Sequence, residues 1–232
     1  HTSWTSGTRS PETLTIPTAG VLNPQEGTVE CWVYLDGDIL ATSPAANHYI
    51  FAHSSNPATL ANVIALARKP GSDGWRFFTS DATGQESQVN VQWVATIGWH
   101  YFAARWSTTE LALFIDGTKV GSINNPKLPG ALASNIYIAT WANGQLWLDS
   151  LIDELRIDKI ARTDEEIAAW YNSDEPMPFQ RGCTYKMDFD NNLQATVGTV
   201  DVEVALSVDG GDTYSQYSEV KSGLSIPGLT GD

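Results

Sequence analysis

Two kinds of side chain in this sequence could support chemistry: carboxylates at a regular spacing and a surplus of tryptophan. Glycoside hydrolysis requires two carboxylates that flank one bond, about 5 to 9.5 Å apart. Asp149 and Asp153 are four residues apart, so a regular strand would place both on one face. Tryptophan occurs nine times, and its ring combines a flat apolar face with a polar N–H group. A tryptophan-rich core would use most of these rings, and two or three exposed ones would suffice to stack on sugar rings.

Other catalytic and metal-binding patterns are absent from the sequence. The histidines form no pair with metal-ligand spacing; they are His1, His48, His53 and His100. No nucleophile elbow, glycine-rich phosphate loop or cysteine–histidine pair occurs. Cys31 and Cys183 match no zinc spacing, which leaves buried free thiols or, outside the cell, a disulfide.

The composition limits the partners of the chain. Its 232 residues include 42% hydrophobic and 17% charged side chains, which is enough for a folded core. The 27 acidic and 13 basic residues give a net charge of −14, which argues against nucleic acid and anionic membranes. No apolar run approaches the roughly 20 residues of a membrane span. We therefore expect no nucleic-acid partner and no membrane insertion.

Short β-type runs separated by Gly, Asn, Asp and Pro must position any site. Because no helices intervene, these runs favour an antiparallel sandwich. The expected strands span residues 14–18, 28–35, 48–53, 62–67, 75–79, 89–95, 98–106, 111–115, 136–140 and 146–157. Asp116-Gly117 predicts a tight turn. One helix is expected at 163–172, because Thr163 and Glu166 form a capping box.

A domain boundary is expected at residues 174–178, which read Asp-Glu-Pro-Met-Pro. We expect residues 1–178 to form the sandwich and residues 179–232 to begin a second β module. In residues 200–208 the large apolar side chains Val200, Val202, Val204, Leu206 and Val208 occupy every second position, as in a half-buried strand. About fifty residues is small for an independent core, so the second module is expected to be partial and truncated at its C-terminal end.

Three stretches in order resemble the laminin-G-like group of the concanavalin A-like lectin/glucanase superfamily. They are GTVECWVY at 27–34, GWHYFAARW with LFIDG at 98–117, and LIDELRI with ART at 151–163. The likeness spans about residues 12–173 and implies an all-β fold, a two-sheet antiparallel jelly-roll sandwich. Members of this group occur in bacterial surface proteins, secreted glycosidases and phage tail or virion proteins. The resemblance therefore implies an extracellular, cell-surface or virion location.

The resemblance also bears on catalysis and on metal binding. The glucanase branch carries Glu-x-Asp-x-x-Glu on one strand, and this chain has no such string, which disfavours a glycoside hydrolase. Non-enzymatic laminin-G-like modules carry an Asp-Glu dipeptide where this chain has Asp153-Glu154. In the glucanase branch an Asp before the last sheet strand often binds a structural calcium, which makes Asp153 a candidate calcium ligand. The alternative is that Asp153 caps a loop or pairs with Arg156 or Arg162.

Strand parity and loop position select the candidate ligand-binding residues. If Phe102 and its alternate neighbours face the core, Tyr101 and Arg105 point outward. Trp75 follows the expected turn at 70–74, and Trp141 precedes Asn143-Gly144. We therefore expect Trp75, Tyr101, Arg105 and Trp141 to anchor a carbohydrate. The alternative is that loops and the helix cover the outward face.

By the same parity, Val29, Cys31 and Val33 in the core would leave Trp32 and Tyr34 outward. The leading hypothesis is a non-catalytic carbohydrate-binding or adhesion module for a neutral polysaccharide or cell-surface glycan. It would belong to a bacterial surface protein or to a phage tail or virion protein. The alternative is a structural spacer, or a module that docks other domains of a larger protein.

Overall fold

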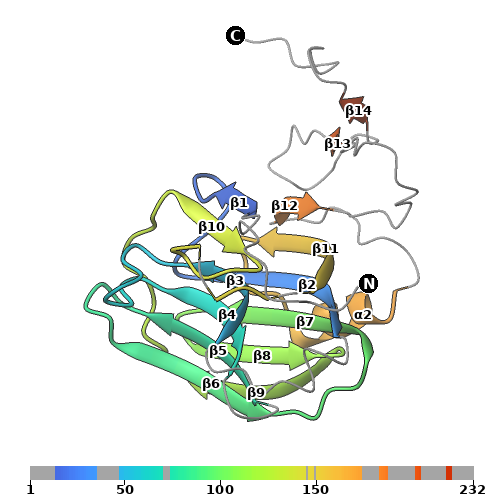
Figure 1. The fold of residues 1–232 in the computed structure, drawn as a ribbon, viewed down its shortest axis with the longest axis horizontal. Helices are drawn as coiled ribbons and strands as arrows, with labels where there is room; N and C mark the ends of the chain where they lie inside the picture. The colour runs from blue at the N-terminus through green and yellow to red at the C-terminus, as the bar shows by residue number, and fades with distance from the viewer. Residues whose placement is uncertain are drawn as a thin grey trace, which may run out of the picture.

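The protein folds into two six-stranded antiparallel sheets that pack face to face (Figure 1). The computed structural model describes residues 14–35, 47–69, 74–144, 146–148, 150–173, 183–187, 202–204 and 218–220. Sheet A has the order β1-β10-β3-β4-β5-β6. Its strands are β1 (Leu14–Pro17), β3 (His48–His53), β4 (Ile64–Arg68), β5 (Gly74–Ser80), β6 (Glu86–Gln92) and β10 (Asn135–Ile138).

Sheet B has the order β12-β11-β2-β7-β8-β9. Its strands are β2 (Gly27–Leu35), β7 (Gly98–Trp106), β8 (Glu110–Ile115), β9 (Thr118–Asn124), β11 (Leu151–Asp158) and β12 (Cys183–Met187). Two further strands, β13 (Val202–Val204) and β14 (Ser218–Val220), pair with each other. The expected all-β sandwich of the jelly-roll type is therefore confirmed. No helix among the described residues is long and apolar enough to cross a membrane.

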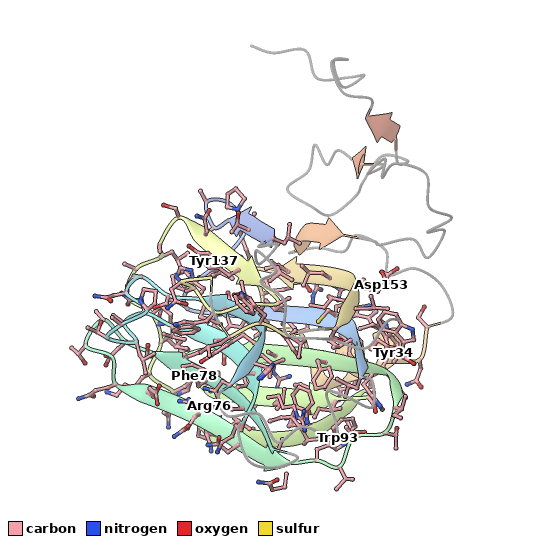
Figure 2. All side chains as sticks on the ribbon, in the orientation of Figure 1. Tyr34, Arg76, Phe78, Trp93, Tyr137 and Asp153 are labelled. Atoms are coloured by element: carbon pink, nitrogen blue, oxygen red, sulfur yellow. The ribbon has the colours of Figure 1, made fainter. Side chains whose placement is uncertain are left out.

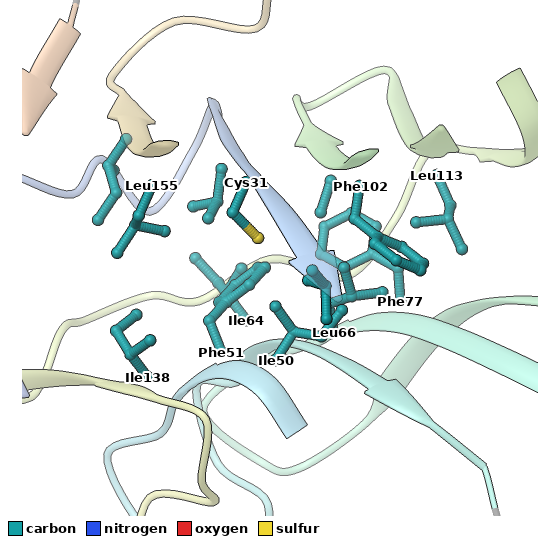
Figure 3. Close-up of a cluster of buried hydrophobic side chains, with 14 of the residues drawn as sticks. Cys31, Ile50, Phe51, Ile64, Leu66, Phe77, Phe102, Leu113, Ile138 and Leu155 are labelled. Atoms are coloured by element: carbon teal, nitrogen blue, oxygen red, sulfur yellow. The ribbon is translucent and has the colours of Figure 1, made fainter. Parts of the chain in front are cut away.

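Alternate side chains of the two sheets fill the space between them. Figure 3 shows Phe51 and Leu66 of sheet A meeting Cys31 and Phe102 of sheet B. Burying a large apolar side chain stabilises the fold by about 1.5–3 kcal/mol, so this cluster accounts for much of the drive to fold. Cys31 is a free thiol in this core, and burial raises its pKa.

Helix α2 (Asp164–Tyr171) covers part of the outer face of sheet B. The helix begins at Thr163, whose hydroxyl accepts a hydrogen bond from the Glu166 amide at 3.2 Å. The Glu166 carboxylate accepts one from the Thr163 amide at 2.8 Å, so the predicted capping box is confirmed. Ile167 and Trp170 of the helix pack on side chains of β7 and β8.

A buried network of charges fixes this helix to the sheet. The Arg156 guanidinium lies 3.2 Å from the centre of the Trp170 ring and forms an ion pair with Glu30. Asp158 lies 3.4 Å from the same guanidinium. Burial raises the pKa of Glu30 to about 7, because loss of solvent outweighs the attraction of Arg156. The ring of Trp170, a residue of helix α2, therefore packs directly on the guanidinium of Arg156 from strand β11.

Strand β9 was not among the strands expected from the sequence. The Asp116-Gly117 turn forms as predicted, with φ of 49° and 72°, and it joins β8 to β9. A two-residue turn with both φ values positive matches the twist of a hairpin. The sequence of β9, TKVGSIN, lacks a clear alternation, because its strand lies at the edge of the sheet and is mostly solvated.

The C-terminal part of the sandwich also differs from expectation. The strand expected at 146–157 begins only at Leu151. Strand β12 pairs with β11, for example Leu155 with Met187, so sheet B continues past the boundary expected at residue 178. A second module in 179–232 stays a prediction, because only 202–204 and 218–220 are described beyond β12.

Candidate functional site

The four side chains predicted as carbohydrate anchors are all buried, so the exposed platform expected from them is wrong. The exposed fractions are 1% for Trp75, 0% for Tyr101, 8% for Arg105 and 4% for Trp141. A ring stacks on a sugar only where one of its faces reaches solvent. The reason for burial differs between the pair on β7 and the two tryptophans.

Tyr101 and Arg105 lie on the outer face of sheet B, as strand parity predicted, but helix α2 covers them. The Tyr101 hydroxyl donates a hydrogen bond to the buried Glu30 carboxylate. Arg105 forms ion pairs with Glu110 of β8 and Asp164 of the helix. Both side chains therefore hold the helix and the sheet together, which is the alternative that the sequence left open.

Trp75 and Trp141 are buried on opposite sides of sheet A. Trp75 belongs to β5 and points into the core, where its ring lies 4.5 Å from that of Phe102. Trp141 lies on the outer face of sheet A, where it contacts Tyr49 at 4.6 Å and Phe78 at 6.4 Å between ring centres. The sequence places Trp75 directly after the expected turn at 70–74, at the start of the expected strand. The observed strand begins at Gly74, and alternation along it points Trp75 into the core.

The outer face of sheet A combines a floor of small side chains with aromatic and polar edges. One row of residues in register runs across it through Trp147, Tyr49, Ala67, Arg76 and Asn90. A parallel row runs through Thr15, Tyr137, Ala52, Ala65, Phe78 and Gln88. Figure 2 shows Tyr137, Phe78 and Arg76 over the strands of this sheet. The alanines at the centre leave room for Trp141 to lie against the sheet.

The connection after β10, described at 139–144 and 146–148, brings a second tryptophan to this face. Trp147 forms an isolated β-bridge with Tyr49, and its ring N–H donates to the Gly144 carbonyl at 2.8 Å. Leu148 is tied back to Ala139 by a backbone hydrogen bond of 2.9 Å. The Trp147 side chain is nevertheless 44% exposed. Among the described residues, no other aromatic side chain is exposed to this degree.

Trp147 is not among the ligand-binding residues predicted from the sequence. It lies between two leucines, Leu146 and Leu148, so it was assigned to a strand expected from 146 onward. In the structure the two leucines do not share a face: Leu148 lies in the core and Leu146 packs against the outer-face cluster with Trp141. Leu146 has a φ of 60°, so strand alternation does not hold here and the exposure of Trp147 comes from the path of the connection.

Arg76 and Glu86 form the charged part of this face. Their side chains make an ion pair of 2.7 Å, and the Arg76 guanidinium lies 3.8 Å from the centre of the Phe78 ring. Glu86 is the sole acidic residue in the six strands of sheet A. Burial raises the pKa of the nearby Tyr49, whose hydroxyl accepts a hydrogen bond from Asn47 at 3.2 Å.

The chemistry available on this face is recognition of a polar, uncharged ligand. An exposed indole offers an apolar surface, while Gln88 and Asn90 are exposed amides that both donate and accept hydrogen bonds. The charges of Arg76 and Glu86 balance each other. Paired carboxylates for acid–base hydrolysis are not found on these six strands.

Asp153, the candidate calcium ligand, lies on β11 in register with Trp32. Its carboxylate accepts a hydrogen bond from the Glu154 amide at 2.8 Å, and Glu154 adopts a φ of 49°. No cluster of three or more His, Cys, Asp or Glu side chains suitable for a metal occurs within the described part of the chain. Calcium takes six to eight oxygen ligands, which Asp153 and Glu154 alone do not provide. Asp149 lies outside the described residues.

Comparison with known proteins agrees with this architecture. The sequence profile of the family described as concanavalin A-like lectin/glucanases superfamily matches residues 9–168. A search of curated proteins finds no matching relative.

Solved structures share the fold at low identity. A pentraxin from Limulus polyphemus has a TM-score of 0.54 and 13% identity, over 74% of this chain and 82% of that one. The binding domain of botulinum neurotoxin serotype D has a TM-score of 0.52 and 12% identity, over 70% of this chain and 43% of that one. Domain 4 of AbnA, an extracellular arabinanase from Geobacillus stearothermophilus, has a TM-score of 0.52 and 18% identity, over 66% of this chain and 69% of that one. That structure contains arabinotriose.

Proposed function

Because the chain belongs to the concanavalin A-like lectin/glucanases superfamily, we propose that it is a non-catalytic carbohydrate-binding module. Its ligand, a neutral polysaccharide or cell-surface glycan, lies on the outer face of sheet A against Trp147. The observation that carries this proposal is a tryptophan that stays 44% exposed although its loop is fixed by hydrogen bonds. Such a ring is already ordered, so binding loses little side-chain entropy.

The surroundings of Trp147 favour an uncharged sugar over an acidic one. The charged pair in the strands of this face, Arg76 and Glu86, is internally neutralised, and the chain as a whole carries a net charge of −14. Exposed amides of Gln88 and Asn90 suit sugar hydroxyls, which also donate and accept. Flat stacking sites desolvate few atoms, so we expect micromolar to millimolar dissociation constants.

The solved relatives support a binding role rather than a catalytic one. The pentraxin, the toxin binding domain and the arabinanase domain are proteins or parts of proteins that share the fold. One of these structures contains an arabinose oligosaccharide. The single carboxylate on the strands of sheet A is consistent with binding without turnover. An extracellular setting, in a bacterial surface protein or a phage tail or virion protein, fits this role.

Affinity electrophoresis against soluble β-glucan, xylan, mannan and arabinan tests the proposal. We expect at least one polymer to retard the wild-type protein. Trp147→Ala should weaken that interaction by about 1–3 kcal/mol, or roughly 5- to 150-fold. Val94→Ala is the matched control, because Val94 is 78% exposed and lies outside sheet A. A folded wild-type protein that binds none of these polymers would favour the spacer or docking function.

A further inference from the structure

A second aromatic surface lies on the opposite side of the sandwich. On the outer face of sheet B, helix α2 covers Tyr101 but leaves Trp32, Tyr34 and Trp99 only partly buried. We call these three residues the β2–β7 strip. They follow directly from the pairing of β2 with β7, in which Tyr34 is opposite Trp99 and Trp32 is opposite Tyr101.

We propose that the β2–β7 strip is a second carbohydrate-binding site, which makes the module bivalent. The strip as a binding site is independent of the site around Trp147, whereas bivalency rests on the proposed function of that site. Figure 2 places Tyr34 at one end of the sandwich, away from Arg76, Phe78 and Tyr137 on sheet A. The sandwich core separates the two surfaces, so one sugar chain segment cannot occupy both at once.

The rings of the strip are held in fixed positions by one another and by the helix. Tyr34 and Trp99 meet edge to face, with 5.6 Å between ring centres and an interplanar angle of 69°. Trp32 stacks on Tyr171 of helix α2 at 5.6 Å and meets Tyr101 at 5.5 Å. Nine consecutive residue pairs hold β2 against β7. The strip is therefore a preorganised surface, and its binding cost in lost side-chain motion is small.

Within the described part of the chain, the polar tips of the strip have no hydrogen-bond partner. The ring N–H groups of Trp32 and Trp99 and the Tyr34 hydroxyl make no hydrogen bond to another described residue, whereas the Trp106 ring N–H is bonded to the Asn23 carbonyl. A half-exposed tryptophan or tyrosine offers an apolar face and one polar tip. A sugar matches this combination, because it has both an apolar C–H face and hydroxyl groups. A purely apolar peptide would leave the polar tips without hydrogen-bond partners.

The acidic side chains beside the strip favour a glycan without acidic groups. Asp153 lies in the same cross-strand row as Trp32, and Glu154 follows it. Strands β2 and β7 contain no lysine and one arginine, Arg105, which forms ion pairs with Glu110 and Asp164. Uronic acids or sialic acids would meet carboxylates on this face, so neutral sugars fit it best.

Affinity electrophoresis with soluble β-glucan, xylan, mannan and arabinan, run on four proteins, tests bivalency. The proteins are wild type, Trp99→Ala, Trp147→Ala and the double variant. A polymer that engages both faces benefits from a high effective concentration at the second site. Each single variant should lose on the order of 10²-fold in apparent affinity for the polymer, and the double variant should not be retarded. Wild type should also cross-link the polymer and raise turbidity, which neither single variant does.

Controls separate loss of the ring from loss of the fold. Trp99→Phe keeps an aromatic face and should retain most of the retardation, and Val94→Ala should behave as wild type. Melting temperature and near-ultraviolet circular dichroism confirm that each variant is folded.

The possible results separate this proposal from the function proposed above. If wild type and Trp99→Ala bind the polymer equally and neither cross-links it, while Trp147→Ala loses all binding, the strip is not a site and the sheet A proposal stands. If Trp99→Ala loses binding and Trp147→Ala does not, the strip stands and the sheet A proposal fails. Binding to no polymer overturns both. A wild-type dimer in light scattering that Trp99→Ala converts to a monomer would also overturn the strip proposal, because a second copy would occupy it.

Discussion

Replacing Glu30 by Gln tests whether burial of this carboxyl controls the pH dependence of stability. Glu30 is fully buried and contacts Arg156 and the Tyr101 hydroxyl. Asp158 lies close enough to raise its pKa further. Glutamine keeps the shape of the side chain but does not titrate. Its single amide oxygen can accept from Arg156, and its NH2 group then faces the Tyr101 hydroxyl, which can accept a hydrogen bond.

The size and sign of the effect follow from the pKa of Glu30, which burial raises from 4.5 to about 7. The folded state holds the proton more tightly than the unfolded chain does. The stabilisation from this group is complete below about pH 4.5 and is lost as the pH rises through about 7. Each pKa unit corresponds to about 1.4 kcal/mol, so the free energy of unfolding should fall by a few kcal/mol, to order of magnitude, across this pH range.

Urea unfolding followed by tryptophan fluorescence at pH 5, 6, 7 and 8 measures this effect. The free energy of unfolding of wild type minus that of Glu30→Gln should fall as the pH rises. Groups common to both proteins largely cancel in this difference. Parallel pH profiles would refute the reasoning, because they would mean that Arg156 compensates fully for the loss of solvent around Glu30.

Three further predictions concern the helix and the metal. Trp170→Ala should cost about 3–5 kcal/mol of unfolding free energy, since the ring is buried against Arg156; a loss below 1 kcal/mol in urea unfolding would contradict the described packing. Thr163→Ala should cost about 1 kcal/mol in the same assay, and Thr163→Ser should restore most of it. The calcium hypothesis predicts that calcium raises and chelator lowers the melting temperature, and that Asp153→Asn abolishes both shifts; a melt that chelator leaves unchanged removes calcium from the account.

Local sequence patterns predicted most of the fold, because the alternation of apolar and polar residues within a strand shows which of its side chains face the core. Alternation placed Phe102 in the core and Tyr101 on the opposite face, and both positions are confirmed. The capping box at Thr163 and the turn at Asp116-Gly117 are likewise short-range features that a few residues determine. Strand β9 escaped prediction because an edge strand faces solvent on much of its surface and needs no apolar alternation.

The candidate site was predicted less well, because exposure depends on contacts between residues distant in sequence. Tyr101 has the correct facing, but whether it reaches solvent is decided by a helix that starts about sixty residues later. Trp141 and Trp147 belong to one connection, and only the folded chain distinguishes the buried ring from the exposed one. Trp32 and Tyr34 were correctly placed outward by parity, yet parity alone could not rank them above Tyr101.

The most direct test of the central claim is a nuclear magnetic resonance titration that follows the indole N–H signals of the nine tryptophans. Trp147→Phe assigns the signal of Trp147, and the titrant is an oligosaccharide of whichever neutral polymer retards the wild-type protein. We expect the Trp147 indole signal to shift progressively with ligand, together with the backbone amides of Arg76 and Asn90 in the same row of sheet A. A ligand that binds and shifts other signals while those of Trp147, Arg76 and Asn90 stay fixed would contradict it.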